Sequence, residues 1–164
     1  MLLIAKRLEE LDFSALMDIY LEGNLEKAEE YGAGGLLRAE REFYDYLRED
    51  FFRQQGAFYA VWTEQGSYVS ALRLEPYKDG WLLEALETAP EDRRKGYAKR
   101  LMAEVLEHMG QAVVYSHVSK RNEASLRTHY ACGFQKYLDH VVYLDGSVTN
   151  RGVTLKFDGR RILG

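Results

Sequence analysis

The stretch ETAPEDRRKGYAKRLM, residues 87–102, decides the fold because it joins a strand to a helix through a basic turn. A strand pattern ends at Pro90, and a helical pattern begins directly after Gly96. The free N–H groups at the start of a helix attract an anion, and a glycine lets the backbone approach that anion closely. We therefore predict an anion site in this turn.

Basic residues are concentrated in the turn, although the whole chain is acidic, with a net charge of −4. A cluster of this kind suits several phosphate groups better than a single carboxylate. The alternative is a solvated basic face, but basic residues at the start of a helix oppose the helix dipole. Neither G-x-x-x-x-G-K-[ST] nor a strand followed by G-x-G-x-x-G is present. The cations are Arg93, Arg94, Lys95, Lys99 and Arg100.

Outside this stretch, helical and strand patterns divide the chain into further elements. Asp12 is a candidate cap for the first helix, which Gly23-Asn24 could break, and Asp79-Gly80 signals a hairpin. We predict an α/β (α+β) fold with a mixed, mostly antiparallel central sheet of about seven strands flanked by about four helices. The expected strands are residues 1–8, 57–64, 67–75, 81–88, 112–118, 134–144 and 152–157, and the expected helices are 13–28, 39–51, 97–109 and 122–132.

Length and composition restrict the class of protein. The chain has 164 residues, of which 46% are hydrophobic and 29% charged, so we expect residues 1–164 to form a single globular domain. The mild net charge argues against a general nucleic-acid or membrane partner. The single cysteine, Cys132, excludes an intramolecular disulfide and a multi-cysteine zinc site. The apolar run at the start of MLLIAKRLEE is too short for a signal peptide or a membrane span, so we expect a cytoplasmic protein. A homodimer is also possible.

Two blocks of the sequence resemble the GCN5-related N-acetyltransferases (GNAT superfamily). Residues 93–98, RRKGYA, look like the R/Q-x-x-G-x-G/A signature with which that family holds the pyrophosphate of acetyl-CoA. Residues 116–134, SHVSKRNEASLRTHYACGF, resemble the family's strand, asparagine and short helix ending in Gly-Phe. The resemblance covers about residues 57–145, whereas residues 1–56 match only in their strand-helix-helix pattern.

The resemblance implies a GNAT-like fold and the direct transfer of an acetyl group from acetyl-CoA to a primary amine, with acetyl-CoA as cosubstrate and no metal. It implies that the backbone of Leu86 and Thr88 holds the pantetheine arm and that Asn122 and Ser125 hold a further part of it. The residues that it implies for the pyrophosphate are Arg93, Arg94, Lys95, Gly96, Tyr97, Ala98 and Lys99.

The transfer needs a base, because an amine is protonated at neutral pH and must lose a proton before it attacks. Glu84 is the first candidate. Strand alternation predicts that Glu84 shares a face with Leu86 and Thr88 while Glu87 faces the other way. A carboxylate on the solvent face of the strand is the alternative interpretation, and Glu87 and Glu75 are alternative bases.

The leaving thiolate benefits from a proton donor, and here the sequence departs from the commonest family pattern. Many members carry a tyrosine four residues before the Gly-Phe pair, a position that His129 occupies in this chain, with Tyr130 next to it. Either residue could serve as the acid, because Tyr130 lies only about 100° further round the helix. A packed tyrosine and a hydrogen-bonded histidine without a catalytic role are the structural alternative.

Two other classes of function stay open. A non-catalytic acyl-CoA-binding or sensing module on the same fold fits the absence of the usual tyrosine. A nucleic-acid or protein interaction domain could use the basic turn, although no second basic segment extends it. No motif in residues 13–56 or in the last hairpin identifies the amine acceptor.

Overall fold

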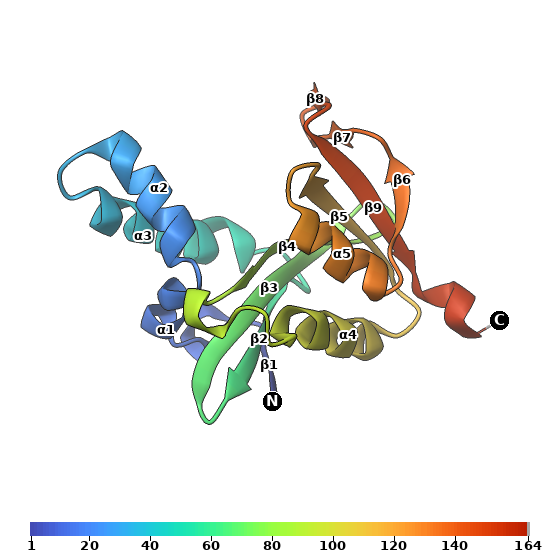
Figure 1. Ribbon diagram of the computed structural model, residues 1–164, viewed down its shortest axis with the longest axis horizontal. Helices are drawn as coiled ribbons and strands as arrows, with labels where there is room; N and C mark the ends of the chain where they lie inside the picture. Colours follow the sequence, from blue (N-terminus) through green and yellow to red (C-terminus); the bar gives the residue numbers. More distant parts are fainter. Residues whose placement is uncertain (164) are drawn as a thin grey trace.

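The computed structural model describes residues 1–163, and the side chains of residues 1–161. A seven-stranded sheet in the order β1-β2-β3-β4-β5-β9-β6 forms its centre (Figure 1). Only the β4–β5 pair is parallel, so the sheet is mixed and mostly antiparallel, as the sequence predicts. The strands are β1 Leu2–Ala5, β2 Phe58–Glu64, β3 Ser67–Tyr77, β4 Gly80–Thr88, β5 Val113–Ser119, β6 Gln135–Leu138 and β9 Gly152–Asp158, and a separate ribbon contains β7 Val141–Val142 and β8 Val148–Thr149.

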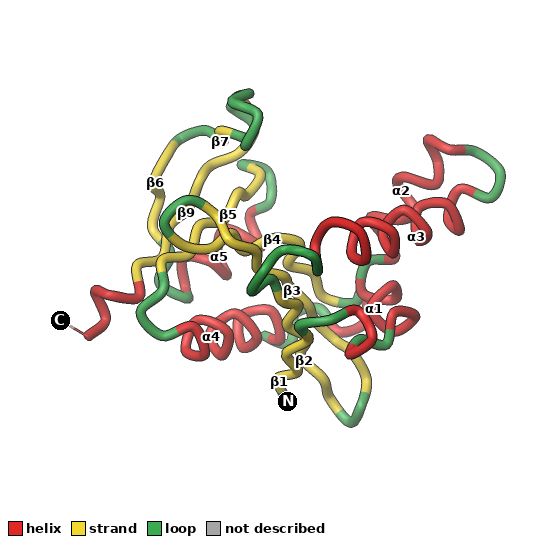
Figure 2. Tube along the Cα trace, turned by 180° about the vertical axis from the view of Figure 1, so that it is seen from behind, coloured by secondary structure: helices red, strands yellow, loops and turns green. Residues whose placement is uncertain are grey.

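Helices cover the two faces of this sheet, and the α2–α3 pair projects away from it (Figures 1 and 2). Asp12 caps the first helix, as expected, because its Oδ1 accepts a hydrogen bond of 3.1 Å from the Ala15 N–H. The helices are α1 Phe13–Ile19, α2 Leu21–Tyr31, α3 Gly35–Tyr46, α4 Tyr97–Met109 and α5 Glu123–Ala131, with short turns at η1 Leu8–Glu10, η2 Leu47–Phe51, η3 Pro90–Asp92 and η4 Gly159–Leu163.

Two apolar layers, one on each face, hold the helices to the sheet. On the α4 face, Leu101 and Val105 pack with Leu72 of β3. On the opposite face, Leu16 of α1 packs with Tyr59 of β2. Each fully buried side chain of this size stabilises the fold by roughly 1.5–3 kcal/mol relative to an exposed one. The strand period of two separates the layers, because successive side chains of β2 and β3 point to opposite faces.

Two expected elements are divided in the structure. The expected helix 13–28 is α1 and α2, and it breaks at Tyr20 rather than at Gly23-Asn24. The backbone of Tyr20 has ψ 14°, outside the α-helical range, so α1 ends at this residue. The hydroxyl of Tyr20 donates a hydrogen bond to the Ala85 carbonyl of β4. The expected strand 134–144 is interrupted after β6, where the carbonyl of His140 accepts a 2.8 Å hydrogen bond from the Thr154 hydroxyl.

A bulge in β4 reverses the expected faces of its last residues. Arg73 lies opposite Glu84 and Ala71 opposite Glu87, so two residues of β4 oppose one residue of β3 between these pairs. Ala85 takes a φ of +56° at this point. The prediction that Glu84 shares a face with Leu86 and Thr88 is therefore wrong. Glu84 and Glu87 lie on the face of α1–α3, whereas Leu86 and Thr88 lie on the face of α4 and α5.

Strands β4 and β5 separate immediately before the bulge. Their parallel pairing ends at Leu83 and Ser116, and Figure 1 shows the two strands diverging beyond this point. Among the described residues, no strand pairs with residues 84–88 along this edge of β4. Backbone N–H and C=O groups are consequently left free for a ligand that enters the opening.

Candidate active site

A groove of about 430 Å³ lies at the opening between β4 and β5. The end of β4, the turn before α4 and the first turns of α4 and α5 form its walls. The structure thus brings the two sequence blocks together, and every predicted CoA-binding residue except Lys95 lines the groove. The Lys95 ammonium lies 3.4 Å from a carboxylate oxygen of Asp92 instead. The predicted residues in the walls are Leu86, Thr88, Arg93, Arg94, Gly96, Tyr97, Ala98, Lys99, Asn122 and Ser125.

The first turn of α4 presents free N–H groups to this groove. Gly96 precedes the helix in a left-handed conformation with φ +81°, and no side chain caps the helix. Within residues 1–163, the N–H groups of Tyr97, Ala98 and Lys99 have no hydrogen-bond acceptor. A Cβ built at Gly96 would meet no protein atom within 4 Å, so the space in front of the glycine is open. This is the geometry of an anion site at a helix N-terminus.

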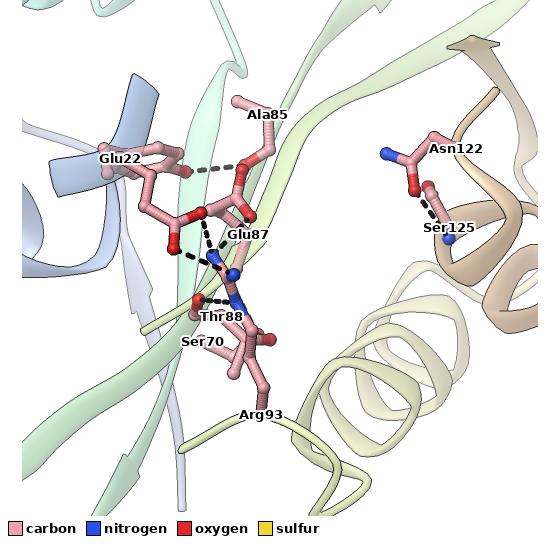
Figure 3. A network of polar contacts seen from close by, with 9 residues as sticks. Glu22, Ser70, Ala85, Glu87, Thr88, Arg93, Asn122 and Ser125 are labelled. Carbon is pink, nitrogen blue, oxygen red and sulfur yellow. Dashed lines mark hydrogen bonds and ion pairs between the residues drawn. The ribbon is translucent and has the colours of Figure 1, made fainter. Parts of the chain in front are cut away.

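The start of α5 forms the facing wall. The Asn122 side chain caps this helix, with its Oδ1 accepting a 3.1 Å hydrogen bond from the Ser125 N–H. Figure 3 shows the amide nitrogen of Asn122 directed toward the space between α5 and β4. The capping bond fixes the amide so that its NH₂ group can donate to a ligand in the groove.

Arg93 fastens the loop at residues 93–96, which precedes α4, to two other elements (Figure 3). Its two terminal nitrogens donate to the Glu22 carboxylate of α2 at 3.1 and 2.9 Å, and its Nε donates to the Thr88 carbonyl at 3.2 Å. The Glu87 carboxylate lies 3.6 Å from the same guanidinium. Burial raises the pKa of Glu87, whereas Arg93 opposes that shift. Arg93 therefore positions the loop as well as adding positive charge to it.

The bulge of β4 is held by hydroxyl groups from other elements. Tyr59 donates to the Tyr20 hydroxyl at 2.8 Å, and Tyr20 donates to the Ala85 carbonyl at 2.6 Å. On the other face, the Ser70 hydroxyl donates to the Glu87 carbonyl at 2.9 Å. Burial raises the pKa of Tyr20 well above its ordinary value, so Tyr20 keeps its proton as a donor. These bonds fix the backbone in which Glu84 lies.

Glu84 lies beside the opening in surroundings that favour its protonated form. Its side chain is 27% exposed, and its Oε1 lies 3.7 Å from the Arg73 Nε, too far for a hydrogen bond. Burial, followed by the neighbouring carboxyl of Glu75, raises the pKa of Glu84 to about 7, against the opposing effect of Arg73. Gln54 donates to Glu75 at 3.2 Å. A carboxylate with this pKa is matched to proton removal near neutral pH.

His129 and Tyr130 have different surroundings. His129 is buried, with its Nδ1 2.7 Å from the Ser125 carbonyl and its Nε2 2.8 Å from the Ser116 hydroxyl. Burial lowers the pKa of His129, so the ring is neutral at pH 7. Tyr130 is 47% exposed and does not line the groove. His129 does not line the groove either, but it contacts Ser125, which does.

Sequence patterns did not indicate several residues of this site. Glu22 and Tyr20 come from the N-terminal helices, for which only an element pattern is available. Arg73 lies in a strand without a motif, and Ser116 begins the second sequence block without a role of its own in it. Arg73 is the only basic residue in its strand, which is a weak signal in the sequence. In the fold, its guanidinium lies over the rings of Phe43, Tyr46 and Phe51 at 5.1–5.9 Å.

A mixed sheet that opens between two parallel strands, with a bulged strand and an uncapped helix start at the opening, defines the N-acetyltransferase class of fold. The chain belongs to the acetyltransferase (GNAT) family, whose model matches residues 18–134. The resemblance of the two sequence blocks is thereby confirmed. The comparison with curated proteins finds no match.

Solved structures of acetyltransferases share this fold. A PaiA N-acetyltransferase from Thermoplasma acidophilum in complex with coenzyme A has a TM-score of 0.66 at 17% identity, covering 96% of this chain and 99% of that one. The ribosomal-protein-S18-alanine N-acetyltransferase from Escherichia coli has a TM-score of 0.60 at 18% identity, covering 96% and 94%. An aminoglycoside 6'-acetyltransferase of type Ii has a TM-score of 0.64 at 14% identity, covering 96% of each chain.

Two features are absent from the described residues. They contain no group of three or more His, Cys, Asp or Glu side chains placed to hold a metal ion. None of their helices is both long enough and apolar enough to cross a membrane.

Proposed function

We propose that the protein transfers an acetyl group from acetyl-CoA directly to a primary amine, without an acyl-enzyme. The observation that carries this proposal is the position of two features on β4. The groove lies along the unpaired end of this strand, and Glu84, whose pKa is raised to about 7, is the first residue beyond the β4–β5 pairing. An anion-binding groove and a tuned carboxylate at one opening are the two parts that acetyl transfer to an amine requires. We further propose that residues 1–164 act as a single acetyltransferase domain in the cytoplasm.

Acetyl-CoA would lie along the groove with its pyrophosphate at the start of α4. The free N–H groups of Tyr97, Ala98 and Lys99 and the positive charge of Arg94 support this position. The pantetheine arm would follow the unpaired edge of β4 at Leu86 and Thr88, with Asn122 and Ser125 on the opposite wall. The coenzyme A complex of the PaiA enzyme, which has the same fold, agrees with acetyl-CoA as cosubstrate.

Glu84 would act as the base. The amine enters from the α1–α3 face, on which Glu84 lies, and gives a proton to the carboxylate before it attacks the carbonyl carbon. Holding the amine and the thioester in this geometry supplies about 7–11 kcal/mol of the barrier reduction available to such reactions. His129 is our candidate for serving the leaving thiolate, and Tyr130 is the alternative.

A primary amine is the acceptor class that similar structures favour. The names of three of them specify a ribosomal-protein alanine, an aminoglycoside and spermidine. All of these acceptors carry an amino group that is protonated at neutral pH. A half-buried carboxylate such as Glu84 is suited to remove that proton.

The experiment that tests the proposal measures thiol release from acetyl-CoA with a panel of amines, polyamines, aminoglycosides, amino acids and peptides. Turnover with at least one amine, reduced on the order of 100-fold or more in Glu84→Gln at unchanged CoA affinity, is the expected result. CoA binding without turnover on any member of the panel would favour the non-catalytic acyl-CoA module instead. A protein that does not bind CoA would contradict both functions.

A further inference from the structure

Ser116 of β5 and His129 of α5 form a buried hydrogen-bonded pair at the point where β4 and β5 separate. Ser116 is 3% exposed and His129 is 1% exposed, and 2.8 Å separates the serine Oγ from the histidine Nε2. On its other side, the ring lies 2.7 Å from the carbonyl of Ser125, a residue of the groove wall. A continuous chain of hydrogen bonds therefore joins the groove wall to the end of the β4–β5 pairing.

The carbonyl of Ser125 determines where the protons of this chain lie. A carbonyl oxygen can only accept a hydrogen bond, so Nδ1 of His129 carries the proton and donates it. Nε2 consequently has a free lone pair, which accepts the hydroxyl proton of Ser116. In this state Ser116 Oγ can receive a proton from a ligand while it passes its own proton to Nε2.

The pair lies across the opening from Glu84. Ser116 is opposite Leu83 in the last parallel pair, and Glu84 is the next residue of β4. The side chain of Glu84 lies on the α1–α3 face, whereas Ser116 contacts α5 on the other face. A thioester at the opening between the strands would thus have a carboxylate on one side and a serine hydroxyl on the other.

We propose that Ser116 and His129 together move a proton from the attacking nitrogen to the departing sulfur. This inference rests on the proposed acetyl transfer. Glu84 removes the first proton of the ammonium group, and the free amine forms a C–N bond to the acetyl carbon, which leaves a second excess proton on nitrogen. That proton passes to Ser116 Oγ as the serine proton passes to His129 Nε2.

The return of the protons completes the step. Nε2 gives its proton back to Ser116 Oγ, Oγ gives a proton to sulfur, and the C–S bond breaks. The products are the amide, the free thiol and the first proton, which Glu84 releases to solvent. The serine and the histidine regain their starting protonation. The step needs no oxidant, reductant or further reactant, and it needs no histidine that is protonated at rest.

The first test needs no acceptor amine. It records the imidazole ¹⁵N resonances of His129 in the unsubstituted protein with saturating CoA and with saturating desulfo-CoA, which lacks only the sulfur. We expect a change of the Nε2 resonance with CoA that desulfo-CoA does not produce, because the proposal places the sulfur, and no other atom of CoA, next to the Ser116 hydroxyl. Identical spectra for two ligands that both bind would overturn the inference and leave the CoA site intact. Failure of both to bind would contradict the proposed function itself.

The second test measures kcat for Ser116→Ala and His129→Asn with the amine that the panel turns over fastest. We expect each variant to lose on the order of 100-fold in kcat at unchanged CoA affinity, and the double variant to lose little more, because the two residues act as one unit. A solvent deuterium effect on kcat should also shrink in both variants. Thr154→Val is the matched control, since it removes a buried hydroxyl of the neighbouring strand β9 that bonds to a loop carbonyl.

Two further results, one from these variants and one from mass spectrometry of the intact protein, would overturn the inference. One is near-native kcat in Ser116→Ala. The other is an acetylated Ser116 in the intact protein after acetyl-CoA is added without amine, because this would make the serine a nucleophile rather than a proton carrier. If Ser116→Ala does not fold, the resonance measurement still decides, since it uses the unsubstituted chain.

Discussion

The Tyr20 hydroxyl donates a 2.6 Å hydrogen bond to the carbonyl oxygen of Ala85, and this bond ties the junction of α1 and α2 to the bulge of β4. The residue that ends the first helix therefore also fixes the backbone next to Glu84. One phenol group thus connects the junction of α1 and α2 with the bulged part of β4.

Tyr20→Phe should test this coupling. The substitution leaves the Ala85 carbonyl without its donor and removes the acceptor of the Tyr59 hydroxyl, so we expect a loss of about 1–3 kcal/mol in the free energy of unfolding and a lower kcat. Denaturant unfolding and turnover are the measurements. Tyr31→Phe is the control, because the Tyr31 hydroxyl bonds only to Glu42 among the described residues, far from the bulge. Equal effects of the two substitutions would argue against a special role of Tyr20.

The pH dependence of kcat should follow the ionisation of Glu84. Because a base must be deprotonated to act, activity should rise as the pH passes through about 7 and level off above it. Glu75→Gln removes the neighbouring carboxyl that helps to raise the pKa of Glu84, so the rise should move to lower pH. Glu84→Gln should lose the rise altogether. If Glu87→Gln abolishes the rise and Glu84→Gln does not, the base is Glu87.

Gly96→Glu should abolish CoA binding without unfolding the protein. The new side chain enters the open space in front of α4, where it blocks the ligand and repels its phosphates. Gly66→Glu is a closely matched control, since Gly66 has the same φ of +81°, equally open surroundings and a place in the β2–β3 turn. Both variants should lose similar stability, about 1–2 kcal/mol, because each forces a side chain into the left-handed region. Only Gly96→Glu should lose CoA in a binding titration, and native affinity in that variant would contradict the loop assignment.

His129 should make the stability of the fold depend on pH. Burial lowers its pKa below the ordinary 6.5, so the unfolded chain binds more protons at this residue than the folded chain does. Its contribution is present above pH 6.5 and is lost as the pH falls below that value. Unfolding measured between pH 7.5 and pH 5 should therefore show a smaller decline of stability in His129→Asn than in the unsubstituted protein. Parallel declines would show that His129 is protonated equally in both states.

Features that depend on near neighbours in the chain could be predicted from the sequence alone. The turn at residues 93–98 could be located because a strand ending, a glycine and a helix start are encoded within a few positions. For the same reason Asp12 and Asn122 could be placed at helix starts, and both cap their helices through side-chain oxygens. The succession of these elements predicted a mixed, mostly antiparallel sheet, and the two sequence blocks indicated the family.

Only the tertiary structure decided which side chains meet at the opening. The face of Glu84 depends on a bulge, and a bulge depends on how β4 pairs with β3 and on the Tyr20 hydroxyl, which lies 65 residues away from Ala85 in the sequence. Strict alternation of side chains along β4 therefore predicted the wrong face for Glu84 relative to Leu86 and Thr88. The pair of Ser116 and His129 likewise forms only when α5 packs on β5. Local patterns carry the conformation of a segment, but the partners of a buried polar group are set by the packing of segments far apart in the chain.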